Sequence, residues 1–175
     1  TIWFSGLPAS GKSTLARELE KKLFNLGYAT YILDGDNVRL GINKDLGFSL
    51  KDREENIRRV AEIAKLFNQA GVIVLCSFVA PTEKIRQMAC SIIGKDKFLE
   101  VYVNTPLEVC EKRDPKGLYK KAREGKIKDF TGISSPFEEP ENPFLSIDTS
   151  KVSLSDAVAR LVKEVVSKIG SITPQ

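Results

Sequence analysis

The chain has 175 residues, the size of a single domain, and 42% of them are hydrophobic, which is enough for a buried core. Its 27 basic and 23 acidic residues leave a net charge of +4, too small an excess for a nucleic-acid-binding surface, so we expect the basic residues to bind phosphate or sulfate groups of small molecules. The sequence has no run of about 18 apolar residues and no signal peptide, which predicts a cytoplasmic protein without a membrane segment.

The first predicted strand, residues 2–4, leads directly into a phosphate-binding pattern. Residues 6–13 read G-x-x-x-x-G-K-S, the P-loop, whose backbone N–H groups can surround phosphate oxygens. Within this pattern Lys12 can reach the β- and γ-phosphates, and Ser13 can offer its hydroxyl to Mg²⁺. A helix follows up to Gly27, as predicted by the apolar residues Leu15, Leu19, Leu23 and Leu26.

Strands and helices alternate along the rest of the chain. Apolar runs predict strands over 28–33, 72–76, 98–103 and 145–149, and amphipathic repeats predict helices over 53–70, 82–94, 105–113 and 155–169. Thr105 reads as the N-cap of the third helix, with Pro106 at its first position. This order predicts an α/β P-loop NTPase fold, with a parallel β-sheet core and helices on both faces. Ligands bind beyond the carboxyl ends of such strands, so we expect a common rim of Asp34, Asp36, Ser77, Asn104 and Thr149.

Asp36 is the acid that we expect to act in the chemistry. The central strand ends at Ser77 and not at the aspartate that many P-loop ATPases use for Mg²⁺, and residues 43–46 lack the final acid of a guanine-binding N-K-x-D motif. Without histidine, proton transfer falls to Asp, Glu, Lys or water, and Asp36 follows the second strand. These features favour a small-molecule kinase. The alternative is that Asp34 and Asp36 only shape a turn around Gly35.

Arginines, an aromatic residue and a basic segment lie near the same rim. The planar guanidinium group suits bound oxyanions, which makes candidates of Arg39, Arg53, Arg58 and Arg59, although a solvated helix face explains the last two equally well. Phe48 can stack on a base or fill the core. Residues 114–144 have no sustained period and predict a lid, with six cations between 116 and 128. A solvated amphipathic helix is the alternative for these cations.

Several motifs together resemble the adenylyl-sulfate kinase family. They occupy residues 6–13, 33–39, 46–49, 52–59, 113–122 and 128–133, in the order of the family and over almost the whole chain. The P-loop is shared by very many proteins, whereas D-G-D-N-V-R at 34–39 and K-G-L-Y-K-K-A at 116–122 are much more specific. The chain therefore resembles a single kinase domain over residues 1–175, with a basic lid at about 114–144.

The resemblance implies a reaction and its ligands. The γ-phosphate of ATP would pass to the 3′-hydroxyl of adenosine 5′-phosphosulfate (APS), giving 3′-phosphoadenosine 5′-phosphosulfate (PAPS) and ADP in sulfate activation and assimilation. Mg²⁺ would accompany ATP. The family is typically homodimeric and occurs fused to ATP sulfurylase, so we expect a homodimer and a fused or associated ATP sulfurylase. The chain has no initiator Met and starts inside a predicted strand, which predicts residues upstream of Thr1. From its composition we expect no nucleic acid and no membrane as partners.

The resemblance also implies the site residues. Lys12 and Asp36 would be catalytic, and Ser13 and Asp36 would hold the metal. The ATP site would comprise Gly6, Ala9, Ser10, Gly11, Lys12, Ser13, Thr14, Arg113 and Val152. The APS site would comprise Asp36, Asn37, Val38, Arg39, Phe48, Arg53, Glu54, Glu55, Asn56, Val79, Ala80, Lys116, Asp129 and Phe130, with Phe48 and Phe130 on either side of the adenine.

The sequence departs from the family at one informative position. Where the family usually reads F-I-S-P, residues 78–81 read F-V-A-P, so Ala80 lacks the hydroxyl that some members can phosphorylate. Direct transfer of the phosphoryl group from ATP to the acceptor hydroxyl needs no such serine. Two other functions stay open. The first is a regulatory module that binds PAPS without turnover; the intact P-loop and Asp36 argue against it. The second is a kinase for another hydroxyl compound, which would leave Phe48 and residues 34–39 without a function.

Overall fold

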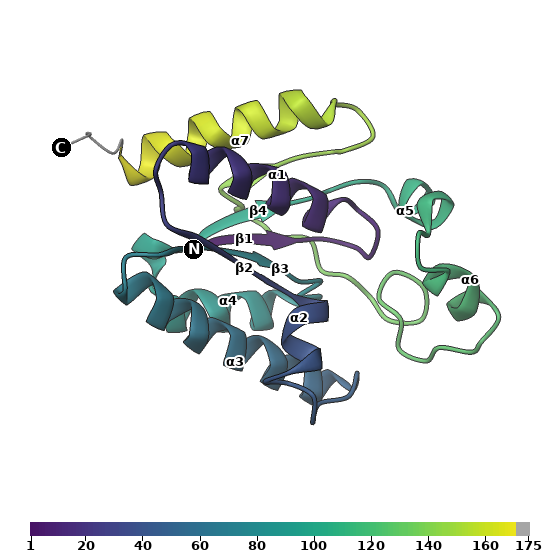
Figure 1. Ribbon diagram of the computed structural model, residues 1–175. Helices are drawn as coiled ribbons and strands as arrows, with labels where there is room; N and C mark the ends of the chain where they lie inside the picture. Colours follow the sequence, from purple (N-terminus) through teal and green to yellow (C-terminus); the bar gives the residue numbers. More distant parts are fainter. Residues whose placement is uncertain (171–175) are drawn as a thin grey trace.

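The computed structural model describes residues 1–170, and within them five parallel strands form one sheet between two layers of helices (Figure 1). The elements are β1 (Ile2–Ser5), α1 (Lys12–Asn25), β2 (Thr30–Asp34), α2 (Gly35–Leu40), α3 (Leu50–Gln69), β3 (Ile73–Ser77), α4 (Glu83–Ile93), the 3₁₀ turn η1 (Lys95–Lys97), β4 (Leu99–Tyr102), α5 (Leu107–Arg113), α6 (Leu118–Arg123), β5 (Leu145–Ser146) and α7 (Leu154–Ile169). Residues 171–175 of the predicted domain lie outside the described residues.

The strand order places the P-loop at the middle of the sheet. The order is β2-β3-β1-β4-β5, and β1 pairs in parallel with β3 and β4. Phe4 lies opposite Ser77 on one side and opposite Val101 on the other. Because all strands run the same way, their carboxyl ends share one edge, and the loop after β1 is flanked there by the loops after β3 and β4. The predicted parallel sheet is confirmed.

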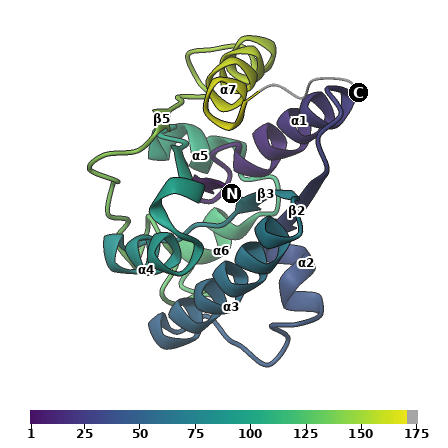
Figure 2. The ribbon, with the colours of Figure 1, turned by 90° about the vertical axis from the view of Figure 1, so that its left-hand side faces the viewer.

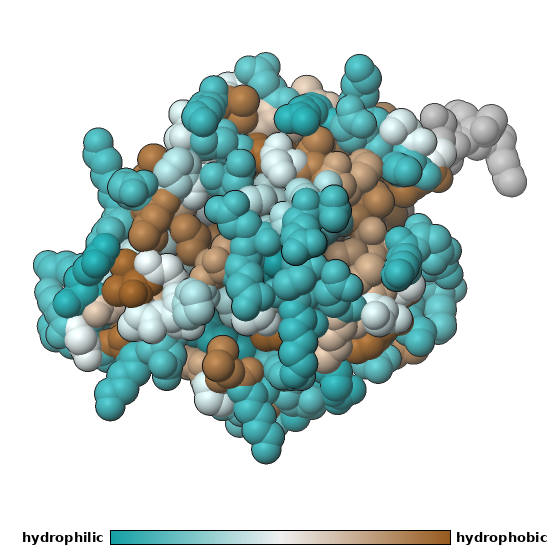
Figure 3. All heavy atoms as spheres, turned by 180° about the vertical axis from the view of Figure 1, so that it is seen from behind, coloured by the Kyte–Doolittle hydropathy of each residue, from teal (hydrophilic) through white to brown (hydrophobic). Residues whose placement is uncertain are grey.

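Each face of the sheet is covered by its own pair of helices. Alternate residues of a strand point to opposite faces, so Phe4 belongs to the core under α1 and α7, while Trp3 belongs to the core over α3 and α4. Figure 2 shows these two helix pairs on either side of the strands. From behind, Figure 3 shows hydrophilic side chains over much of the visible face, with apolar ones in patches between them.

Helix α2 is the element that the sequence did not predict. The side chain of Asp34 accepts hydrogen bonds from the backbone N–H groups of Asp36 and Asn37, at 3.0 and 2.8 Å. The Asn37 side chain in turn accepts from the backbone N–H of Asp34, at 3.1 Å. This reciprocal capping box starts a helix where the residues suggested only a turn.

Several boundaries differ from the predicted ones for similar reasons. Helices α3 and α7 start earlier than expected because Ser49 and Ser153 cap them. Strand β5 ends at Ser146 and does not reach residue 149. Thr105 is not the cap of α5: Pro106 occupies the N-cap position without a side-chain bond, and the Thr105 hydroxyl donates to the Ser10 carbonyl at 3.1 Å.

The predicted lid projects beyond the carboxyl ends of the strands, beside α5 and α6 (Figure 1). Helix α6 is its only helix among the residues described, and the lid has a small core of its own around Tyr119 and Phe130, whose ring centroids are 5.0 Å apart. The three cysteines form no disulfide. No helix within residues 1–170 is long and apolar enough to cross a membrane.

Candidate functional site

The P-loop has a backbone that only glycine accommodates at two positions. Gly6 has φ 147°, and a Cβ there would lie 2.6 Å from the Val103 carbonyl oxygen of the neighbouring chain segment. Gly11 has φ 106°, and a Cβ there would lie 3.2 Å from a Thr149 methyl carbon. Such contacts and angles disfavour any side chain, so both glycines are needed for the loop to curl.

Lys12 is folded back onto the loop. Its ammonium group donates to the Leu7 carbonyl at 2.6 Å and lies 3.4 Å from the Ser10 hydroxyl oxygen. Only 8% of the residue is exposed. Burial disfavours the charged form and lowers the pKa of Lys12 to about 8. A bound polyphosphate would supply the negative charge that this buried cation lacks.

Two threonines and an arginine hold the P-loop from behind. The hydroxyls of Thr105 and Thr149 both donate to the Ser10 carbonyl, at 3.1 and 2.8 Å. Arg113 donates to the hydroxyl and to the carbonyl of Thr149, at 2.7 and 3.0 Å. From the sequence we expected Thr149 at the rim and Thr105 as a helix cap, but not their contact with the P-loop, because no motif connects residues so distant along the chain.

A cavity of about 660 Å³ lies over the P-loop and α1. We call it the donor cavity, because the P-loop is the predicted binding site of the phosphate donor. Seven of the predicted ATP-site residues line it: Ala9, Gly11, Lys12, Ser13, Thr14, Arg113 and Val152. The other two act in the loop itself, since Gly6 makes its first bend and Ser10 is fully buried.

A second cavity of about 800 Å³ lies on the other side of Lys12. We call it the acceptor cavity, because the predicted residues of the phosphate-accepting substrate line it. Nine of the predicted substrate residues line it: Asp36, Arg39, Phe48, Arg53, Asn56, Val79, Ala80, Lys116 and Phe130. Phe48 is 61% exposed, whereas Phe130 is 7% exposed and belongs to the lid core. The sequence thus predicted residues from six separate segments that the fold brings to one cavity.

The donor and acceptor cavities meet at four polar side chains, those of Lys12, Ser13, Asp36 and Lys116. Lys116 of the lid donates to a carboxylate oxygen of Asp36 at 2.7 Å. The Ser13 and Ser77 hydroxyl oxygens are 3.1 Å apart. A cation, a carboxylate and hydroxyls therefore surround the point where a group could pass from one cavity to the other.

The two neighbouring aspartates have different surroundings. Asp34 caps α2 and lies 3.8 Å from Arg17, so its role is structural, although it starts a helix and does not form a turn. Asp36 makes no such cap, and within residues 1–170 its carboxylate forms an ion pair with the lid lysine at the junction. A catalytic role of Asp36 stays a prediction.

Two arginines frame the aromatic wall of the acceptor cavity. Arg39 donates to the carbonyls of Leu46 and Gly47, at 3.1 and 2.9 Å, and its guanidinium carbon lies 4.4 Å from the centroid of the Phe48 ring. Arg53 donates to the Phe48 carbonyl at 2.9 Å. Burial lowers the pKa of both guanidinium groups, yet they stay charged at neutral pH.

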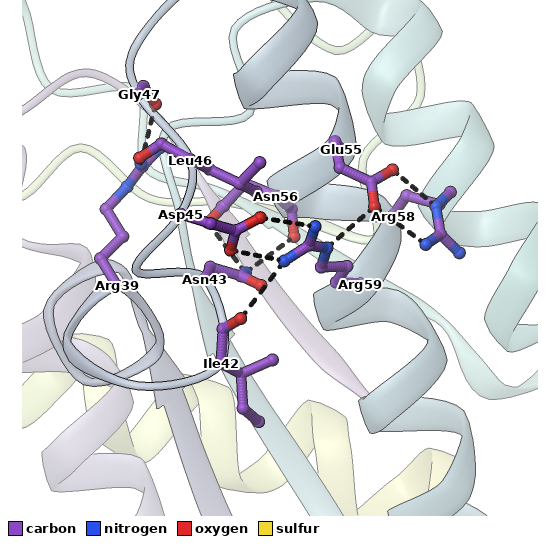
Figure 4. A network of polar contacts seen from close by, with 10 residues as sticks. All are labelled: Arg39, Ile42, Asn43, Asp45, Leu46, Gly47, Glu55, Asn56, Arg58 and Arg59. Atoms are coloured by element: carbon purple, nitrogen blue, oxygen red, sulfur yellow. Dashed lines mark hydrogen bonds and ion pairs between the residues drawn. The ribbon is translucent and has the colours of Figure 1, made fainter.

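The loop over residues 41–49 is fastened to α3 by a separate polar network (Figure 4). The buried Asn43 amide donates to the Asn56 side-chain oxygen at 3.0 Å. Arg59 pairs with Asp45 and Glu55, both at 2.8 Å. Arg59 thus shapes the loop from outside the cavity, and Arg58 pairs with Glu55 on the solvent side (Figure 4).

Five predicted substrate residues do not line the acceptor cavity. Asn37 is occupied by the capping box, Val38 is in the core, Glu54 pairs with Lys84, Glu55 pairs with Arg58 and Arg59, and Asp129 accepts from Arg53 through its carbonyl. Asn104 also lies apart, in a third cavity with Tyr102 and Phe137. Substrate contact stays a prediction for these five residues and for the nine that line the cavity.

Known proteins match this chain over nearly its whole length. The profile of the adenylylsulphate kinase family matches residues 1–148. An adenylyl-sulfate kinase of Bacteroides thetaiotaomicron is 60% identical over 168 residues, covering 96% of this chain and 84% of the relative. The structure of the APS kinase of Mycobacterium tuberculosis in complex with AMPPNP and APS superposes with a TM-score of 0.90 at 44% identity, covering 94% of this chain and 95% of the other.

A more distant structure shows how the same domain recurs in a larger chain. A hexameric APS kinase from Thiobacillus denitrificans is 27% identical with a TM-score of 0.71; the match covers 98% of this chain and 29% of the other. The P-loop, the two joined cavities and these matches lead to one conclusion: the chain belongs to the adenylyl-sulfate kinase family.

Proposed function

We propose that the chain transfers the γ-phosphate of ATP to the 3′-hydroxyl of APS, forming PAPS and ADP. The observation that carries this proposal is the meeting of two cavities at Lys12, Ser13, Asp36 and Lys116. A similar structure, the APS kinase of Mycobacterium tuberculosis, is a complex with AMPPNP and APS, which supports ATP and APS as the nucleotides that would fill them. Phosphoryl transfer depends mainly on positioning and on neutralising charge, and this junction offers both.

Each residue at the junction has a definite task in the transfer. The 3′-oxygen of APS attacks the γ-phosphorus, the bond from that phosphorus to the β,γ-bridging oxygen breaks, and the hydroxyl proton passes to the Asp36 carboxylate. Lys12 holds the β- and γ-phosphates. Lys116, a lid residue, faces the transferring group from the other side, where its charge offsets the negative charge that spreads over the phosphoryl oxygens.

The oxygens at the junction fit a magnesium ion. Mg²⁺ prefers oxygen ligands and is usually held by one or two protein groups together with phosphates and water. The Ser13 hydroxyl and the Asp36 carboxylate are such groups, and within residues 1–170 no cluster of three or more His, Cys, Asp or Glu forms a closed metal cage. When bound, Mg²⁺ would neutralise phosphate charge beside these residues.

The acceptor cavity supports APS as the second substrate. Phe48 and Phe130 supply aromatic surface for an adenine, and Arg39 and Arg53 supply charge for a phosphosulfate. We also propose that the chain forms a homodimer and receives APS from an ATP sulfurylase, fused or separate. Light scattering on the purified chain tests the first point, and a monomeric mass would contradict it.

The direct test is to incubate the chain with MgATP and APS and to follow ADP and PAPS by chromatography. We expect one PAPS for each ADP, and a loss of about 10²-fold or more in kcat for Asp36→Ala, the range that general base catalysis supplies. Glu18→Ala is the control, since Glu18 pairs with the exposed Lys21 on α1 and lines neither cavity. PAPS binding without turnover would instead favour a regulatory module, and turnover with other hydroxyl compounds but not with APS would contradict the acceptor.

A further inference from the structure

A buried arginine on α4 lies just behind the acceptor cavity. Arg86 is 1% exposed although it is a charged residue, and it lies between the buried Ile85 and the exposed Gln87 in the sequence of the helix. One terminal nitrogen donates to the Ala80 carbonyl at 2.9 Å, and the other donates to a Glu83 carboxylate oxygen at 2.6 Å. Its Nε lies 3.1 Å from a carboxylate oxygen of Glu100 on β4. Arg86 itself does not line the cavity.

The segment that Arg86 holds is part of the cavity wall. Residues 78–81, here called the acceptor loop, connect β3 to α4, and all four line the acceptor cavity. Within it Ala80 has φ 43°, a left-handed conformation that a residue with a side chain adopts only when its surroundings impose it. The bond from Arg86 to the Ala80 carbonyl is one such constraint.

A second constraint comes from the far end of the lid. The backbone N–H of Glu138 donates to the Pro81 carbonyl at 2.8 Å, and its carboxylate accepts from the backbone N–H of Glu83 at 2.7 Å. The adjacent Phe137 ring lies 5.6 Å from the Arg86 guanidinium carbon and stacks on Tyr102. The acceptor loop therefore accepts hydrogen bonds from Arg86 of α4 at one position and from Glu138 of the lid at the next.

The charges show that Arg86 is more than a space-filling residue. Burying a guanidinium group and carboxylates carries a desolvation cost, and apolar residues of the same volume often stabilise a fold as well or better. Burial also raises the pKa of Glu100, against the opposing effects of the Ser5 hydroxyl and Arg86. What an apolar side chain cannot replace is the hydrogen bond to the Ala80 carbonyl, which sets the direction of that peptide group.

We propose that Arg86 is a positioning residue for the acceptor substrate: through the Ala80 carbonyl it holds the acceptor loop in its left-handed shape, and Glu138 holds the other end of the same loop from the lid. This inference rests on the proposed function, because it takes the nucleotide of the acceptor cavity to be APS. Arg86 and Glu138 make no hydrogen bond to residues 6–13 within the described chain, and Ser5, which precedes the P-loop, donates to Glu100 and not to Arg86, so we expect the main effect on the acceptor side.

The primary test is the double variant Arg86→Met/Glu100→Gln, which keeps side-chain volume and leaves no unpaired charge on β4. We expect kcat/KM for APS to fall about tenfold to a hundredfold, the range for a small misplacement of a bound reactant, while ATP affinity changes less than about twofold. Gln87→Met is the matched control, since Gln87 also bonds Glu83, at 2.7 Å, but is exposed and does not reach the loop.

Two further variants separate positioning from folding. Arg86→Lys keeps one donor and should recover part of the kcat/KM for APS that the double variant loses. Glu138→Ala changes an exposed residue; it should raise the KM for APS without lowering the thermal midpoint by more than Gln87→Met does. If the double variant does not fold, Arg86→Lys decides, because it keeps the charge but cannot make both the bond to the Ala80 carbonyl and the bond to Glu83 with the same geometry. An unchanged KM and kcat/KM for APS in the folded variants, or an equal loss of ATP affinity, overturns the inference. A parent chain that makes no PAPS overturns the proposed function instead.

Discussion

Binding of ATP is expected to take up a proton at Lys12 when the pH is near or above 8. In the ligand-free chain, burial lowers the pKa of Lys12 to about 8, so about half of the molecules carry a neutral amine at pH 8 and about nine tenths at pH 9. ATP phosphates beside the amine favour its charged form and raise the pKa again. Uptake should therefore grow from about a tenth of a proton at pH 7 to nearly one at pH 9.

Titration calorimetry of MgATP in buffers of different ionisation enthalpy measures this uptake. Lys12→Arg is the informative variant, because its guanidinium group stays protonated in both states and should abolish the pH-dependent uptake. The three buried or half-buried thiols do not interfere, since burial raises their pKa values. No uptake by the parent chain at pH 9, or the same uptake in Lys12→Arg, would refute the reasoning.

Three other substitutions test single contacts of the site. Asp34→Ala removes the capping box of α2 and should lower the free energy of unfolding by about 1 kcal/mol in urea titrations; an unchanged midpoint would speak against the cap. Thr149→Val removes a donor to the Ser10 carbonyl and should weaken ATP binding about tenfold by calorimetry, with little effect on the KM for APS; the reverse pattern would be inconsistent with the contacts seen. Arg39→Ala should raise the KM for APS far more than the Kd for ATP, and equal changes would place Arg39 outside the acceptor site.

The parallel sheet and the P-loop could be predicted because their signals are local. A buried parallel strand is a continuous apolar run, as in residues 72–76, and the P-loop is a contiguous pattern between a strand and a helix. The same holds for Asp36, which follows a strand directly. In each case the residues that specify the structure are neighbours in the chain.

The contacts that hold the site in place were not predictable in this way. Arg86 stands in a helix segment rich in polar residues, and it is buried against Glu100 of β4 and Phe137 of the lid. Thr105 read as a helix cap, but its hydroxyl finds the Ser10 carbonyl, 95 residues away in the chain. Helix α2 was missed because Asp and Asn favour turns as well as caps, and only the reciprocal bonds decide between them.

The ion pair between the lid and Asp36 explains how the site can be closed and yet remain ready to react. Lys116 and Asp36 are 2.7 Å apart, but their side chains are 60% and 73% exposed, so water competes with the contact and the pair adds little stability. Arriving nucleotides can therefore separate it at little cost. In the proposed reaction the two separated groups would have opposite tasks: the ammonium would face the transferring phosphoryl group, and the carboxylate would accept the 3′-hydroxyl proton. A buried pair would resist this exchange, because each charge would lose its only partner in a medium that water does not reach. The exposure of the pair is thus what the proposed chemistry requires.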